Sequence, residues 1–193
     1  MEIEAMPSDP TADMGRRDLL KARGAGAARL ATPWVSSPVY AEDGAAVFYA
    51  ADRRPDGSFA FAGFDAGGRL RFEVALPGRA HDAAVRPGAR EVVVLARRPG
   101  RFALVVDSLD GRPLHELSSA EGRHFYGHGV FSPDGRWFYT GENDYDGQRG
   151  VIGVRDAGQG YRQVGEIPSH GLCPHQLAFL PDGRTLACAN GGL

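Results

Sequence analysis

From about residue 34 onward, the chain alternates short apolar segments with turns rich in Gly, Pro and Asp. Each segment has roughly the length of a β-strand, and none sustains the period of an amphipathic helix. The pattern predicts an all-β protein with about 13 or 14 antiparallel strands and almost no helix. The clearest strand segments read AAVFYAADRR, SFAFAGFDAGG, RLRFEVALPG, REVVVLARRPG, RFALVVDSLDG, PLHELSS, RWFYTGEND, GVIGVRDAG and YRQVGEIPS.

These segments recur at a fixed spacing. HDAAVRPGAREVVVLA begins at His81, HGVFSPDGRWFYTGEN at His128 and HQLAFLPDGRTLACAN at His175, so the repeat is 47 residues long. A unit of about 40 to 50 residues that holds four strands is typical of a β-propeller blade. The repeat predicts blades at about residues 34–78, 79–125 and 126–172, and an incomplete blade at 173–193.

A propeller normally closes into a ring of blades, because closure removes exposed sheet edges. About three and a half blades cannot close, so we expect part of a longer, seven-bladed propeller, or an open edge that another chain covers. In the blade that begins at His128, Pro133 and Gly135 mark the first turn, because Pro cannot donate in a ladder and Gly tolerates positive φ. Strands are expected there at residues 128–132, 136–141, 151–155 and 161–167, and the inward-facing core residues are expected to include Val130, Phe138, Val151, Ile152, Leu177, Phe179 and Leu186.

The first 33 residues have a different character, with no apolar period that could build a core. Arg16 and Arg17 precede an apolar pair and a Lys, which resembles a twin-arginine export signal. Arg23 and Arg29 interrupt the apolar segment that such a signal needs, so a degenerate signal and a plain disordered tail both stay open. The first alternative predicts a periplasmic protein and the second a cytoplasmic one.

Composition excludes several classes of protein. With 24% charged residues and a formal net charge of -2, the chain carries no basic stripe for nucleic acid. No apolar run approaches the roughly 20 residues of a membrane-spanning helix. The sequence also has no zinc-ligand spacing, nucleophile elbow, phosphate-binding loop or dinucleotide fingerprint.

The phased histidines are the strongest candidates for chemistry. In a four-stranded meander, the starts of the first and third strands and the ends of the second and fourth lie at one edge, because successive strands reverse direction. Imidazole is a versatile ligand for transition metals, so a metal ion is a possible cofactor at this edge. The alternative is that the histidines only tie loops to the backbone. The candidate ligands are His81, His128, His175, His124, Glu142 and Asp144, with Asp82 and Asn143 as groups that would orient them.

Two further expectations concern the acidic residues after Gly141 and the two cysteines. Glu142, Asp144 and Asp146 also fit a solvated turn, and DYDG lacks the further oxygens of a dedicated calcium loop. If the turn at Pro181 pairs the last two strands, Cys188 faces about Leu177, roughly 13 Å from Cys173, which is beyond disulfide reach. Both thiols are expected to be free.

The segments HFYGHGVFS, TGENDY and RGVIGV closely resemble the bacterial domain of unknown function family 1513, a group of exported WD40-like or YVTN-like propeller proteins. The resemblance covers about residues 34–193, the N-terminal half of a family member, and departs from it at Leu172, Cys173 and Gln176. It implies an envelope protein, often grouped with iron-uptake genes, with no established chemical activity.

Three functions follow. The first is a non-enzymatic propeller that binds a metal, a small ligand or an envelope partner protein at its histidine face, in iron handling. The second is a lactonase-like hydrolase, because CPHQLAFLPDGRTLACAN is similar to blade starts in propeller lactonases, where a channel His acts as a base. The third is a purely structural scaffold.

Overall fold

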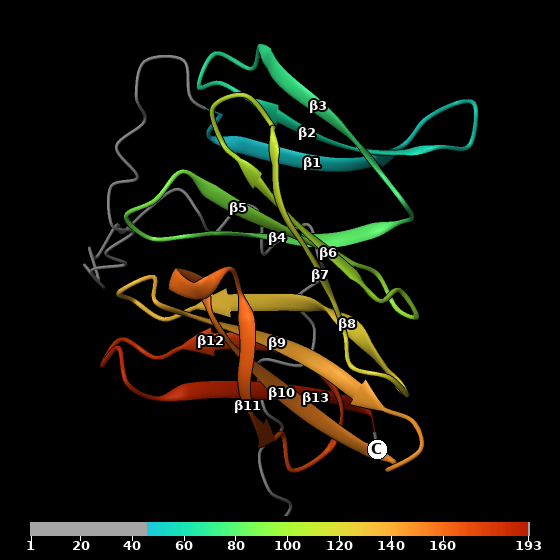
Figure 1. Ribbon diagram of the computed structural model, residues 1–193, viewed down its shortest axis with the longest axis vertical. Helices are drawn as coiled ribbons and strands as arrows, with labels where there is room; N and C mark the ends of the chain where they lie inside the picture. The colour runs from blue at the N-terminus through green and yellow to red at the C-terminus, as the bar shows by residue number, and fades with distance from the viewer. Residues whose placement is uncertain (1–45, 193) are drawn as a thin grey trace, which may run out of the picture. The chain divides into compact units, whose positions relative to one another are not determined.

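The computed structural model describes residues 46–192, and within them it is almost entirely β-sheet (Figure 1). In this part of the chain, thirteen strands form four antiparallel sheets, and the one helical element is a short 3-10 turn, η2, at Ala157–Gln159. No helix among the described residues is long and apolar enough to cross a membrane. The strands are β1 Phe48–Arg53, β2 Phe59–Phe64, β3 Leu70–Leu76, β4 Ala80–Val85, β5 Glu91–Ala96, β6 Phe102–Asp107, β7 Pro113–Ser118, β8 Arg123–Phe131, β9 Trp137–Asp144, β10 Arg149–Asp156, β11 Arg162–Pro168, β12 Leu172–Phe179 and β13 Leu186–Gly192.

The sheets are meanders whose spatial order follows the chain, which confirms the predicted four-stranded propeller blades. The second sheet is β4-β5-β6-β7 and the third is β8 to β11 in sequence, while β12 and β13 form a hairpin. The first sheet, β1-β2-β3, runs directly into β4, as β7 runs into β8. Its strands therefore correspond to the second, third and fourth of a blade, and the start of the predicted blade at 34–78 lies outside the described residues.

The twin-arginine-like segment at Arg16 and Arg17 also lies outside the described residues, so export stays a prediction. Inside them, β8 begins at Arg123, five residues before His128, so this strand is longer than the expected 128–132. The SPDG turn forms as predicted: Gly135 has φ 69 and its N–H donates to the Ser132 carbonyl at 2.8 Å.

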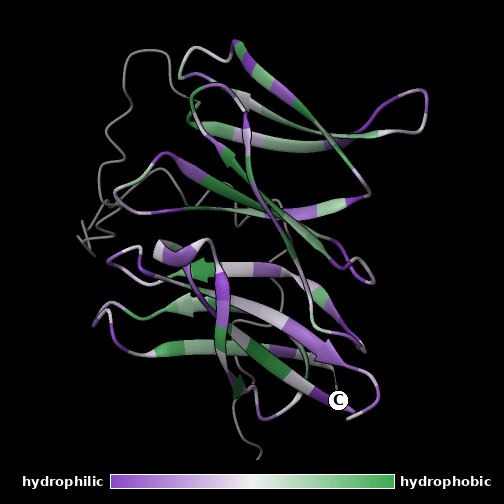
Figure 2. Cartoon of the chain, in the orientation of Figure 1, coloured by the Kyte–Doolittle hydropathy of each residue, from purple (hydrophilic) through white to green (hydrophobic). Residues whose placement is uncertain are grey.

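The core lies between neighbouring sheets. All residues of β5 from Val92 to Ala96 are fully buried, because the second sheet is covered on both faces. One cluster joins the second and third sheets around Phe125 and Phe138, and another joins the first and second around Phe61 and Phe72. Figure 2 shows hydrophobic and hydrophilic residues mixed along the strands, with hydrophilic residues also in the connecting turns.

The predicted core set is partly right. Phe138, Val151, Ile152 and Leu177 are buried, at 0%, 0%, 4% and 2% exposure. Val130, Phe179 and Leu186 are only half-buried, which corrects the prediction for these three. Phe179 and Leu186 belong to the β12–β13 hairpin, whose two strands cover less area than a full blade.

Candidate metal centre

The three phased histidines all lie where the pairing of an inner strand is irregular. His81 sits at the register shift between β4 and β5, His175 at the shift between β12 and β13, and His128 at the shift between β8 and β9. A β-bulge adds unpaired residues to one strand and turns their side chains out of the regular alternation. The same backbone device therefore presents one imidazole from each of three consecutive blades.

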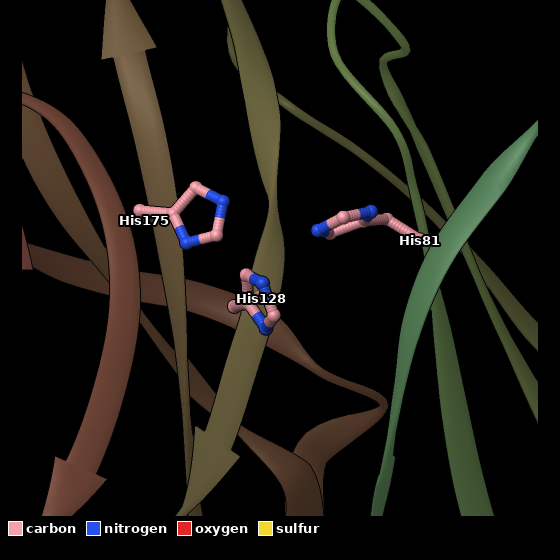
Figure 3. A group of neighbouring side chains, drawn as sticks. All are labelled: His81, His128 and His175. Carbon is pink, nitrogen blue, oxygen red and sulfur yellow. The ribbon is translucent and has the colours of Figure 1, made fainter. Parts of the chain in front are cut away.

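The three imidazoles converge. Their ring centroids are 4.7 Å apart for His81 and His128, 4.8 Å for His128 and His175, and 5.8 Å for His81 and His175. One ring nitrogen of each lies within 4.8 Å of the others. Figure 3 shows the rings of His81 and His175 reaching toward each other from two sides, with His128 between them. β8, which carries His128, lies beside both β4, which carries His81, and β12, which carries His175.

Asp82 orients the central imidazole. Its Oδ2 lies 2.8 Å from Nδ1 of His128, and because an ionised carboxylate can only accept, Nδ1 is the donor. Nε2 of His128 is then the free lone pair, and this buried atom has no hydrogen-bond partner. Burial acts to raise the pKa of Asp82, but hydrogen bonds from His128 and from the N–H of Ala83 outweigh it, so this pKa is lowered.

The pKa of His81 is lowered as well, first by partial desolvation of its ring and then by the neighbouring His128 and His175. Lowering the pKa favours the neutral imidazole, which is the form that binds metals. The close approach of these rings depends on Gly127, which has φ 112. A Cβ at this position would lie 2.5 Å from Cδ2 of His81.

Two residues beside the histidines were not expected from the sequence. The ring of Tyr126 meets His175 edge-on at 5.7 Å. The guanidinium of Arg98 hydrogen-bonds the Tyr126 hydroxyl and lies 5.0 Å from its ring centroid. Tyr126 could have been suspected because it stands two residues before His128, but nothing in the sequence around Arg98 points to this contact.

His124 and Asn143 lie outside the histidine group and have other partners. The His124 ring stacks on Tyr145 at 4.3 Å, and its Nε2 is 2.9 Å from the Tyr145 hydroxyl. Asn143 accepts the backbone N–H of Cys173 through Oδ1 at 3.0 Å. This bond fixes the start of β12. Asn143 therefore helps to position the backbone that carries His175 and does not bond the imidazole of His175.

The acidic candidates also lie apart from the histidines. Glu142 is fully buried in β9, where it accepts from the Thr140 hydroxyl at 2.7 Å and lies 3.6 Å from Nη2 of Arg155. Its burial raises its pKa, and the expectation of a solvated turn is wrong for this residue. Asp144 instead pairs with Arg149 at 3.0 Å and with Arg123 at 3.7 Å.

The prediction of free cysteines is confirmed. Cys173 and Cys188 form no disulfide, and Cys188 is paired in register with Leu177, as the position of the turn indicated.

Comparisons with known proteins agree with the fold. The profile of a family described as protein of unknown function (DUF1513) matches residues 74–193, a shorter range than the 34–193 of the resemblance. No curated protein matches the chain.

Among solved structures, hydrazine synthase of Kuenenia stuttgartiensis is similar, with a TM-score of 0.59 and 22% identity over 74% of this chain and 42% of that chain. The dihydro-heme d1 dehydrogenase NirN has a TM-score of 0.48 and 20% identity over 62% of this chain and 27% of its own. The chain thus spans less than half the length of these similar structures.

Proposed function

Since the chain belongs to the family described as protein of unknown function (DUF1513), whose description assigns no activity, we propose from the site itself that it binds a transition-metal ion through His81, His128 and His175. The observation that carries the proposal is the convergence of three imidazole nitrogens within 4.8 Å, one from each of three blades. Imidazole suits Zn, Cu, Fe and Ni, whereas Ca and Mg prefer oxygen ligands.

The geometry needs only a small adjustment to hold such an ion. Metal–nitrogen distances of about 2.0–2.1 Å with tetrahedral angles place ligand nitrogens about 3.3 Å apart. The rings must therefore close in by about 1–1.5 Å, which side-chain rotation can supply. His81 and His175 are exposed and can move, while the central His128 is held by Asp82.

The hydrogen bonds argue against a purely structural role. A histidine that only ties a loop in place would bond its ring to a backbone carbonyl, as buried polar groups commonly do. Among the hydrogen bonds of the described residues, the ring of His128 bonds a carboxylate, and no bond joins the rings of His81 or His175 to the backbone. A carboxylate behind a histidine is the usual orienting partner of a metal-binding imidazole.

Three neutral imidazoles leave at least one coordination position open, so the bound ion can accept an external ligand. We therefore propose a binding propeller that presents a metal ion, in preference to a lactonase-like hydrolase, because a hydrolase of that kind needs one histidine as a base, whereas three convergent imidazoles form a ligand set for a metal. The proposal retains the envelope as its setting, which rests on the twin-arginine-like segment at Arg16 and Arg17.

The test is metal binding by the full chain. After incubation with Zn²⁺, Co²⁺ or Cu²⁺ and gel filtration, mass spectrometry of the metal content should find about one ion per chain, and the double variant His128→Ala and His175→Ala should retain none. The control is His115→Ala, because His115 is exposed on β7 and outside the group. His115→Ala should unfold near the wild-type temperature because its ring is exposed, whereas the double variant should unfold at a somewhat lower temperature, because it removes the largely buried ring of His128 and its bond to Asp82. A wild-type chain that retains no metal, or a folded double variant that binds unchanged, would refute the site.

A further inference from the structure

Arginines gather on one side of the histidine group. Arg53 ends β1, Arg79 precedes β4, and Arg97 and Arg98 follow β5. The end of β5 and the start of β4 lie at the same edge of the second sheet, because Ala80 is paired with Ala96. Three of these arginines therefore stand at the edge from which His81 projects.

Two cavities lie at this edge. One of about 500 Å³ is lined by Arg53, Arg79 and His81, with Asp52 as the one carboxylate among its lining residues. The other, of about 540 Å³, shares Arg79 and adds Arg97 and Arg98. Each is within the usual size of small-molecule sites. Because Arg79 lines both, the basic side chains form one continuous surface from His81 outward.

The charges at this edge are not balanced by the protein. No ion pair joins Arg79 or Arg97 to an acid among the described residues, whereas Arg54 pairs with Glu73 and Arg86 with Glu91. A divalent ion on three neutral imidazoles adds two more positive charges. The carboxylates of Asp52 and Asp82 do not offset the charges of the ion and the arginines, so the loaded site favours an anion.

We infer that the metal centre takes a small organic anion with two acidic groups, one at the open metal position and one among Arg79 and Arg97. The inference rests on the proposed metal function. Guanidinium groups match carboxylates with paired hydrogen bonds, and a metal ion takes a carboxylate oxygen directly. A ligand with a single acidic group can satisfy one of these partners but not both.

The experiment uses the full chain loaded with Co²⁺, whose visible absorption reports its ligands. Succinate and butyrate are titrated as probes, because they have the same number of carbons and differ in one carboxylate. Succinate should change the spectrum at a concentration about tenfold lower than butyrate, since a charge-assisted hydrogen bond contributes about that factor or more. The double variant Arg79→Gln and Arg97→Gln should lose the advantage of succinate, and its Co²⁺ affinity should be unchanged or higher. The control Arg184→Gln lies in the turn before β13 and should behave as wild type.

The outcomes separate the two proposals. Equal responses to succinate and butyrate in a Co²⁺-loaded chain would overturn the anion site and leave the metal site standing. The same holds if the double arginine variant prefers succinate as strongly as wild type. A wild-type chain that takes up no Co²⁺ refutes the metal function, and the anion inference falls with it.

Discussion

Asp82→Asn removes the charge from the carboxylate that orients His128 and changes almost nothing in volume. In the native chain, Oδ2 of Asp82 accepts from Nδ1 of His128 at 2.8 Å, which leaves Nε2 as the lone pair for the metal. An Asn can still accept through its amide oxygen, so the ring can keep its orientation. What is lost is the negative charge that raises the basicity of the imidazole and attracts the cation.

The expected loss of metal affinity in Asp82→Asn depends on how exposed Asp82 and His128 are. Loss of an orienting carboxylate typically lowers metal affinity by about 10-fold to 100-fold. The Asp82 side chain is 38% exposed and His128 is 14% exposed, so solvent screens the carboxylate in part. We therefore expect the lower end, about a tenfold weaker affinity, which corresponds to about 1.4 kcal/mol.

Competition between the chain and a chromophoric chelator for Zn²⁺ measures this factor directly. Asp82→Asn should bind about tenfold more weakly than wild type, and Asp82→Ala more weakly still, because it also leaves Nδ1 without an acceptor. The control Asp52→Asn removes a neighbouring charge that touches no histidine, and should change the affinity by a smaller factor. Wild-type affinity in both Asp82 variants would show that His128 does not depend on Asp82 for metal binding.

Two further predictions concern the backbone and acid stability. Gly127→Ala should weaken Zn²⁺ binding in the same competition assay, because the new Cβ would lie 2.5 Å from Cδ2 of His81 and a φ of 112 is unfavourable for Ala. Unchanged binding would mean that His81 can move aside without losing the metal. The pKa of Glu166 is lowered in the folded protein, mainly by the hydrogen bond from Arg123. This hydrogen bond therefore stabilises the fold above the ordinary pKa of 4.5, and the stabilisation is lost as the pH falls through the lower pKa of the folded state. Urea unfolding between about pH 5 and 3 should therefore show a smaller acid loss in Arg123→Gln than in wild type, and equal losses would contradict the linkage.

The 47-residue repeat could be found from the sequence because its turns and its strands both depend on local residue patterns. A turn such as SPDG requires particular residues at particular positions, and the apolar alternation on each side requires only the pleat of a strand. The 47-residue interval between His81 and His128 then fixes which strands occupy equivalent places. The position of the Leu180 to Thr185 turn even gave the correct partner of Cys188.

The position of Glu142 could not be predicted in the same way. Its neighbours in sequence, Asn143 and Asp144, are polar, so the segment resembles a solvated loop. In the structure β9 continues to Asp144, and Glu142 is buried on the same strand face as Thr140, near Arg155 from β10. Gly153 makes room for it, because a Cβ there would lie 2.4 Å from Oε1 of Glu142. Such compensation between a buried acid, an arginine and a distant glycine is a tertiary property that no local pattern carries.

The period predicted that the three histidines occupy equivalent places and face a common channel, but it did not predict the backbone irregularities that turn their side chains there. In a regular strand, side chains alternate between the two faces of the sheet, and an inner-strand residue would pack against the next blade. At His81 and His175 one extra residue interrupts the ladder, and at His128 the interruption is longer. Each bulge releases one side chain from the alternation, and Gly127 lets β8 approach His81 closely enough for the rings to meet. A device that repeats with the blade can therefore bring one ligand per blade to a common point, although the ligands are 47 residues apart in sequence.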